Sequence, residues 1–221
     1  MNVLVTPELV VAYSQCPRKA YLLCKGETGE PHEYVRILER RVIENREEYL
    51  RTIDSSSDLV STNLTLRSGD FETYCDVLTT RGESSYEPTL VVGTHKVTQD
   101  QKIRLAYIGH VIGQLYHRKP STGIIVLGQD KIHKAKLEAS YATVNRIIST
   151  LQTWVTGTTT EEPQVILNDH CPSCQYRHQC ITAAEKANSL TLLDRMTPKL
   201  IRRFQKKGIF TVTQLSYSTV R

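Results

Sequence analysis

Apolar residues recur every three to four positions over long stretches of the chain, a spacing that places them on one face of an α-helix. The clearest helical stretches are 99–115 and 134–154, and another begins at His32. Between the helical stretches, runs rich in β-branched residues are separated by short polar segments, which is typical of strands. Strands are expected over 59–66, 71–78, 86–92 and 123–127.

The order of these elements is a helix, three strands, a helix, a strand and a helix, which predicts an α/β fold with a mixed central sheet flanked by helices. Turns are expected at 55–58, 68–70 and 81–84, so the first three strands form a hairpin or meander. Near the N-terminus, Thr6-Pro7 predicts a capped helix start. Cys16-Pro17 then ends that helix before a second short one.

After Cys180 the composition changes, and a helix is expected over 183–193. A basic helix, a turn at Gly208 and a Thr-capped helix follow, which resembles a helix-hairpin-helix element. Such elements bind phosphate backbones through backbone N–H groups and nearby cations. The alternative is a small helical appendage with a solvated charged face. The candidate DNA-binding residues are Lys199, Arg202, Arg203, Lys206 and Lys207.

Two domains are expected, at 1–185 and 186–221, with the second leading toward a further domain downstream. The 221 residues carry a net charge of +5, which permits nucleic-acid binding without demanding it. We expect no membrane span, because no run of about 18 apolar residues occurs. We also expect a cytoplasmic protein, since the N-terminus lacks a signal-peptide pattern. Six cysteines then favour metal or redox chemistry over disulfides.

Three cysteines follow one another at C-x2-C-x5-C spacing: Cys171, Cys174 and Cys180. A single metal centre can be reached by all three from a short loop, and Cys16 is the best candidate for a fourth ligand. Four thiolates bind either a [4Fe–4S] cluster or a structural zinc ion, and spacing alone leaves both open.

Two acidic residues lie within otherwise apolar strand runs, Asp76 in the second and Glu87 in the third. Carboxylates on neighbouring strands can converge on one Mg²⁺ or Mn²⁺, which is sufficient for phosphodiester hydrolysis. Lys96 could orient the attacking water or stabilise charge on the phosphate. The alternative is that Asp76 bonds to a turn and that Glu87 lies on the surface of an edge strand.

The four cysteines bracketing an Asp…Glu…Lys strand region resemble the RecB-like nucleases of the PD-(D/E)xK superfamily. The most similar members are the iron–sulfur ones: the CRISPR-associated RecB-like exonucleases, the AddB nuclease domain and a RecB-like family fused to an RNase H-like nuclease. The residues that carry the resemblance are Cys16-Pro17-Arg18, the segment around Glu44, Asp76, Tyr86-Glu87-Pro88, Gly93-Thr94-His95-Lys96, Cys171, Cys174 and Cys180.

The resemblance implies a restriction-endonuclease-like sheet and a metal-dependent deoxyribonuclease acting on single-stranded DNA or DNA ends. Asp76 and Glu87 would bind Mg²⁺ or Mn²⁺ with Glu44 as a further ligand, and Lys96 would assist catalysis. The cysteines would hold a structural [4Fe–4S] cluster, and a downstream nuclease or helicase domain or subunit would be a partner.

The sequence departs from the family pattern at Thr89, where a lysine usually follows the acidic residue, so Lys96 or Lys102 would have to substitute. The helix before the sheet offers Glu44 and Asn45 where a histidine is usual. The rival hypothesis is therefore a catalytically inactive nucleic-acid-binding module that keeps the nuclease fold.

Overall fold

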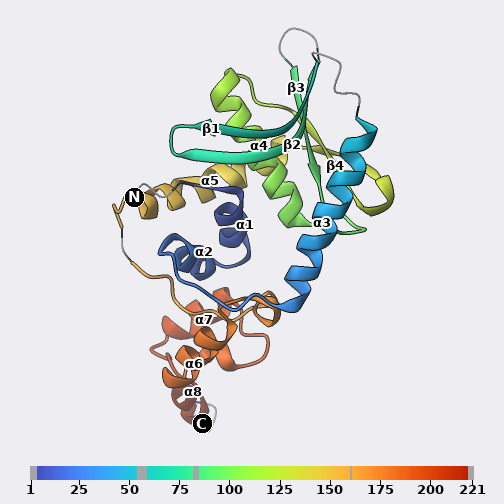
Figure 1. Cartoon of the computed structure of the whole chain (residues 1–221). Helices are drawn as coiled ribbons and strands as arrows, with labels where there is room; N and C mark the ends of the chain where they lie inside the picture. The colour runs from blue at the N-terminus through green and yellow to red at the C-terminus, as the bar shows by residue number, and fades with distance from the viewer. Residues whose placement is uncertain (1–3, 54–58, 82–84, 160, 219–221) are drawn as a thin grey trace. The chain divides into compact units, whose positions relative to one another are not determined.

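The computed structural model describes residues 4–53, 59–81, 85–159 and 161–218. The turn expected at 55–58, and residues 82–84 of the turn expected at 81–84, lie outside the described residues. The chain divides into two compact units (Figure 1). The first, the sheet unit, comprises 1–27 and 34–161. The second, the helical unit, comprises 28–33 and 162–221.

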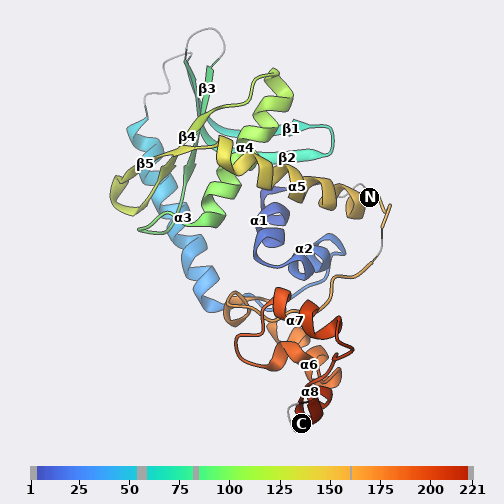
Figure 2. The same ribbon diagram turned by 180° about the vertical axis from the view of Figure 1, so that it is seen from behind.

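The sheet unit contains a five-stranded mixed sheet, whose strands follow one another in chain order (Figure 2). They are β1 (Val60–Ser68), β2 (Phe71–Arg81), β3 (Ser85–Val91), β4 (Thr122–Val126) and β5 (Ile132–Lys136). Only the β3–β4 pair is parallel among these pairs. A parallel connection needs a crossover, and helix α4 (Gln99–Tyr116) provides it. The α/β class expected from the sequence is confirmed.

Local sequence signals set the helix boundaries in this unit. Thr6 caps α1 (Pro7–Gln15) by accepting the N–H of Leu9, and Pro7 occupies the first helical position. Cys16 has extended backbone geometry and separates α1 from α2 (Pro17–Cys24). Thr98 and Gln101 form a capping box at the start of α4. The remaining helices of the unit are α3 (Glu33–Thr52), η1 (Gly128–Asp130) and α5 (Glu138–Val155).

The hydrophobic core of the sheet unit is centred on α4, which packs against β1 to β4 and against α1 and α5. Its residues are buried on several sides, as expected for a helix that crosses between two paired strands. Those with essentially no exposure include Leu105, Tyr107, Ile108, Val111 and Ile112. By contrast, α3 contains no buried residue, and two of its polar side chains bond to Val92 and Asp76, as described below.

The helical unit contains α6 (Arg177–Lys186), α7 (Pro198–Gln205) and α8 (Val212–Ser218), with single 3₁₀ turns at Cys171–Ser173 and Leu190–Leu192. The segment 28–33 belongs to this unit, where Glu30 donates its N–H to the carbonyl of Gln175. Tyr176, Leu190 and Ile201 are its buried apolar side chains of largest size.

Two expected helices are wrong in part. Residues 134–136, expected to start a helix, belong to strand β5, because pairing with β4 overrides the helical preference of the lysines. The helix expected over 183–193 ends at Lys186, since Asn188 takes a left-handed conformation with φ 47°. In the described part of the chain, no helix is both long and apolar enough to span a membrane.

Candidate functional site

Asp76 lies on β2 and is almost completely buried, with 1% exposure. Its Oδ1 atom lies 2.5 Å from Nε of Arg46, which extends from α3. Its Oδ2 atom accepts the N–H of Val91 at 2.7 Å. Burial raises the pKa of this carboxyl above its ordinary value, against the opposing effects of the Val91 N–H and the Arg46 guanidinium.

The register of the sheet explains why Asp76 is buried at this point. Pairing between β2 and β3 reaches Val77 and Thr89, and β3 continues to Val91. The N–H of Val91 therefore lies beyond the paired part of the ladder, and the Asp76 carboxylate accepts it. Arg46 also lies over the ring of Tyr74, with its guanidinium carbon 4.9 Å from the ring centroid. Asp76 thus joins β2, β3 and α3.

Glu87, near the start of β3, is also buried and has a separate group of partners. Arg81 approaches Oε2 at 2.6 Å, while Lys134 and the Thr122 hydroxyl approach Oε1 at 3.2 and 3.1 Å. Burial favours a higher pKa for this carboxyl, but the bonds from Lys134 and Thr122 and the charge of Arg81 bring its pKa below the ordinary value.

The two carboxylates are offset along the sheet and already engaged. Glu87 pairs with Thr79, and Asp76 lies three residues earlier on β2, about 10 Å along the strand. Each carboxylate oxygen has a donor or cation of the protein within about 3 Å, so the arrangement observed does not fit a shared Mg²⁺ or Mn²⁺ ion. Within the described residues, no group of three or more His, Cys, Asp and Glu side chains is placed to hold a metal ion.

Two other candidate residues of the proposed nuclease site, Glu44 and Lys96, are exposed. Glu44 lies on α3, where its neighbour Asn45 donates to the carbonyl of Val92 and Arg46 reaches Asp76. Lys96 lies in the loop between β3 and α4. Sequence reasoning missed Arg46, although its position follows the apolar pattern of α3 at Leu38, Val42 and Tyr49, which indicates the helix face directed at the sheet.

The candidate cysteine ligands are all partly exposed free thiols. Cys171, Cys174 and Cys180 belong to the helical unit, and Cys16 belongs to the sheet unit. The Sγ atom of Cys171 accepts the N–H of Asn168 at 3.2 Å, a type of bond that also stabilises metal-bound thiolates. The residue types therefore suit a thiolate-bound metal, although the observed arrangement collects no set of three ligands in the described chain.

The third group of candidate residues lies on α7 and at its C-cap position, and forms what we call the basic face: Lys199, Arg202, Arg203 and Lys206. Their spacing of i, i+3, i+4 and i+7 places them along one side of the helix, opposite the buried Ile201. All four are exposed, and Lys207 follows directly at the end of the helix.

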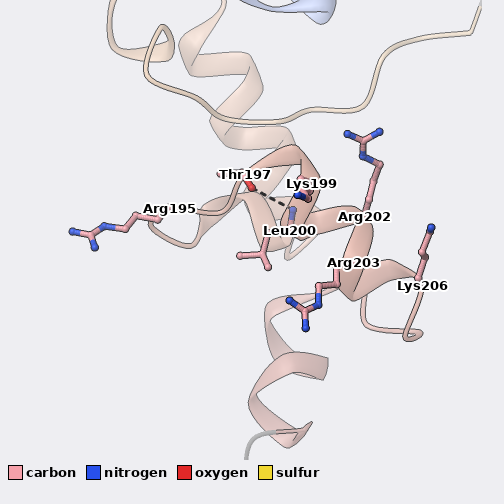
Figure 3. A pocket seen from close by; sticks show the side chains of 7 residues that line it. All are labelled: Arg195, Thr197, Lys199, Leu200, Arg202, Arg203 and Lys206. Carbon is pink, nitrogen blue, oxygen red and sulfur yellow. Dashed lines mark hydrogen bonds between the residues drawn. The ribbon is translucent and has the colours of Figure 1, made fainter.

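The basic face borders a groove of about 660 Å³ that we call the basic groove (Figure 3). Arg195, Thr197 and Leu200 complete its lining, and no acidic residue contributes to it. Thr197 caps α7 by accepting the N–H of Leu200 at 3.2 Å, which fixes the start of the helix. Among the described residues, Lys199, Arg203 and Lys206 have no ion-pair partner, so their charges are available to a ligand.

Comparisons with known proteins assign the chain to no family and find similarity to a solved structure. No family model matches the sequence. No curated protein matches it either. A solved structure described as "Crystal structure of SSO0001" is similar to this one, with a TM-score of 0.46 and 10% sequence identity. The similarity covers 82% of this chain and 87% of that chain, and at this level it carries no argument about function.

Proposed function

We propose that this protein is a nucleic-acid-binding module, with DNA as its ligand and the basic face of α7 as its contact surface. The observation that carries the proposal is the stripe of four exposed cations along α7, which borders a groove without acidic residues. Proteins bind phosphate backbones mainly through such lysine and arginine side chains, and the contact releases counterions from the nucleic acid.

The arrangement of the basic face suits successive phosphates better than a single small anion. The first and last of its residues, Lys199 and Lys206, are seven positions apart, which corresponds to about 10 Å along a helix. The phosphates of one strand of B-DNA follow one another every ~3.4 Å along the axis, so the two guanidinium and two ammonium groups can contact several successive phosphates. Arginine adds bidentate phosphate contacts that lysine does not provide.

The state of the two buried carboxylates favours binding over cleavage in this proposal. Arg46 provides the positive charge beside Asp76, and Arg81 with Lys134 provides it beside Glu87. A divalent cation would have to displace these partners before it could bind. We therefore derive no hydrolytic step, and the metal-dependent nuclease predicted from the sequence becomes the alternative that an experiment must distinguish.

The experiment is to measure binding and cleavage on the same fluorescently labelled DNA. The full chain should bind DNA in EDTA with a Kd of about 1–100 μM at physiological salt, as expected for non-specific backbone contacts. It should leave single- and double-stranded DNA uncut in Mg²⁺ and in Mn²⁺. Cleavage that requires the metal and disappears in Asp76→Ala would restore the nuclease function, while absence of binding would overturn the proposal.

The cysteines of the helical unit remain part of the proposal as ligands of a structural metal centre. We expect anaerobically purified protein to contain iron and to absorb broadly at about 400 nm, in keeping with thiolate-bound iron–sulfur centres. Cys171→Ala should remove the metal, whereas Cys75→Ala should retain it because Cys75 is a buried thiol on β2. If metal analysis finds one zinc and no iron per chain, the centre is a zinc site. If it finds neither metal, the proposed metal centre is wrong.

A further inference from the structure

A second groove of about 490 Å³ lies next to the basic groove in the helical unit. The two grooves share Arg195 and Thr197 in their linings, so they adjoin one another. We call the second one the apolar groove, because Leu167, Leu192, Leu193 and Met196 contribute to its walls. Its volume is within the range of small-ligand pockets, about 300–1,000 Å³.

The apolar groove differs from the basic groove in its polar groups. Arg195 is its only lysine or arginine in the lining found for the described residues, and it pairs with Asp194 at 3.5 Å. The Asn168 amide oxygen accepts the N–H of His170 at 2.9 Å, so the carboxylate of Asp169 is the main acceptor left in the lining. The Asp169 carboxylate repels phosphate but accepts hydrogen bonds from amino groups. The apolar walls and acceptor groups therefore suit a neutral, flat, partly apolar group that carries N–H donors.

The wall between α6 and α7 is fixed by hydrogen bonds within the unit. The Thr191 hydroxyl accepts the N–H of Leu167 at 2.6 Å, and the Ser189 hydroxyl accepts the N–H of Thr191 at 3.3 Å. Thr191 is buried, with 5% exposure, and the adjacent Leu190 is buried as well. The apolar groove is therefore preformed, and a ligand entering it pays little for ordering this part of the chain.

We propose that the two grooves together bind single-stranded nucleic acid, with phosphates on the basic face and an unpaired base in the apolar groove. This inference rests on the proposed function and adds that the nucleic acid bound is single-stranded. In a duplex the bases are stacked and paired, so none can enter the groove without being extruded. The Asp169 carboxylate favours bases with exocyclic amino groups, which are adenine, cytosine and guanine, over thymine.

Three DNA probes of equal length test the inference with the full chain: a single strand, the same strand with abasic sites throughout its centre, and the corresponding duplex. The single strand should bind at least about fivefold more tightly than the abasic strand, since base contacts contribute this much or more. Leu192→Ser should remove this difference, because Leu192 lines the groove, and the fold should tolerate the change because Leu192 is 38% exposed. Ile132→Ser on β5, with 63% exposure, is the matched control.

Each outcome is informative. If the single strand binds tightly, the abasic strand and duplex bind weakly, and only Leu192→Ser removes the preference, the inference is supported. If all three probes bind equally, the basic face binds backbone as proposed, but the assignment of the apolar groove is overturned. A preference that survives in Leu192→Ser also overturns it. If no probe binds, the proposed function fails together with the inference.

Discussion

Replacing Asp76 by alanine is expected to lower the free energy of unfolding by about 3–5 kcal/mol, the largest stability change that we predict for one residue in the sheet. The variant leaves Nε of Arg46 and the N–H of Val91 without their acceptor, and both lie beside a buried position. Since the Arg46 side chain is 27% exposed, water can partly resolvate it, which favours the lower end of the range. Urea denaturation monitored by circular dichroism, in EDTA, measures the change.

The direction of this change separates two roles for Asp76. A carboxylate kept in place for a divalent cation is a buried charge in the metal-free protein, so its removal would leave stability unchanged or increase it in EDTA. A carboxylate that joins β2, β3 and α3 gives a large loss instead. Asp194→Ala is the matched control, because Asp194 is 92% exposed and should change stability by less than about 0.5 kcal/mol.

Much of the fold is predictable because its signals are local. The capped start of α1, the break at Cys16-Pro17 and the apolar periodicity of α4 all depend on residues close in sequence. Strand β5 is not predictable in this way, because four of its five residues are exposed and only Ala135 is buried. Its conformation comes from pairing with β4, which propensity does not record.

The candidate site is harder to predict from the sequence than the fold, because its contacts join residues far apart in the chain. The burial of Asp76 and Glu87 follows from their apolar strand runs, but the identity of their partners does not. Lys134, which contacts Glu87, lies on the strand that the sequence did not indicate, and Arg46 comes from a helix about 30 positions before its partner. The basic face is easier to predict, because its spacing along α7 is visible in the sequence alone.

Neutralising the basic face by changing its four residues to glutamine is expected to weaken DNA binding by about 100-fold or more at moderate salt. The loss of up to four phosphate contacts is the physical reason, and the fold should be unaffected because all four side chains are exposed. Fluorescence anisotropy with a labelled single strand measures the affinity. A charge-matched variant provides the control by changing four exposed cations of the sheet unit, Arg40, Arg41, Lys131 and Lys136.

If the charge-matched control loses as much affinity as the basic-face variant, binding depends on net charge and not on α7. If neither variant loses affinity, DNA is held elsewhere on the protein. Thermal unfolding of both variants shows whether either change has altered the fold, so that a loss of binding can be assigned to the missing charges.

The most direct test of nucleic-acid binding by α7 is the salt dependence of the affinity, measured for the wild type and the basic-face variant in EDTA. Four phosphate contacts on a single strand predict a slope of about −3 when the logarithm of the association constant is plotted against the logarithm of the salt concentration. For the basic-face variant the slope should approach zero. An equally steep slope in both proteins would contradict the account.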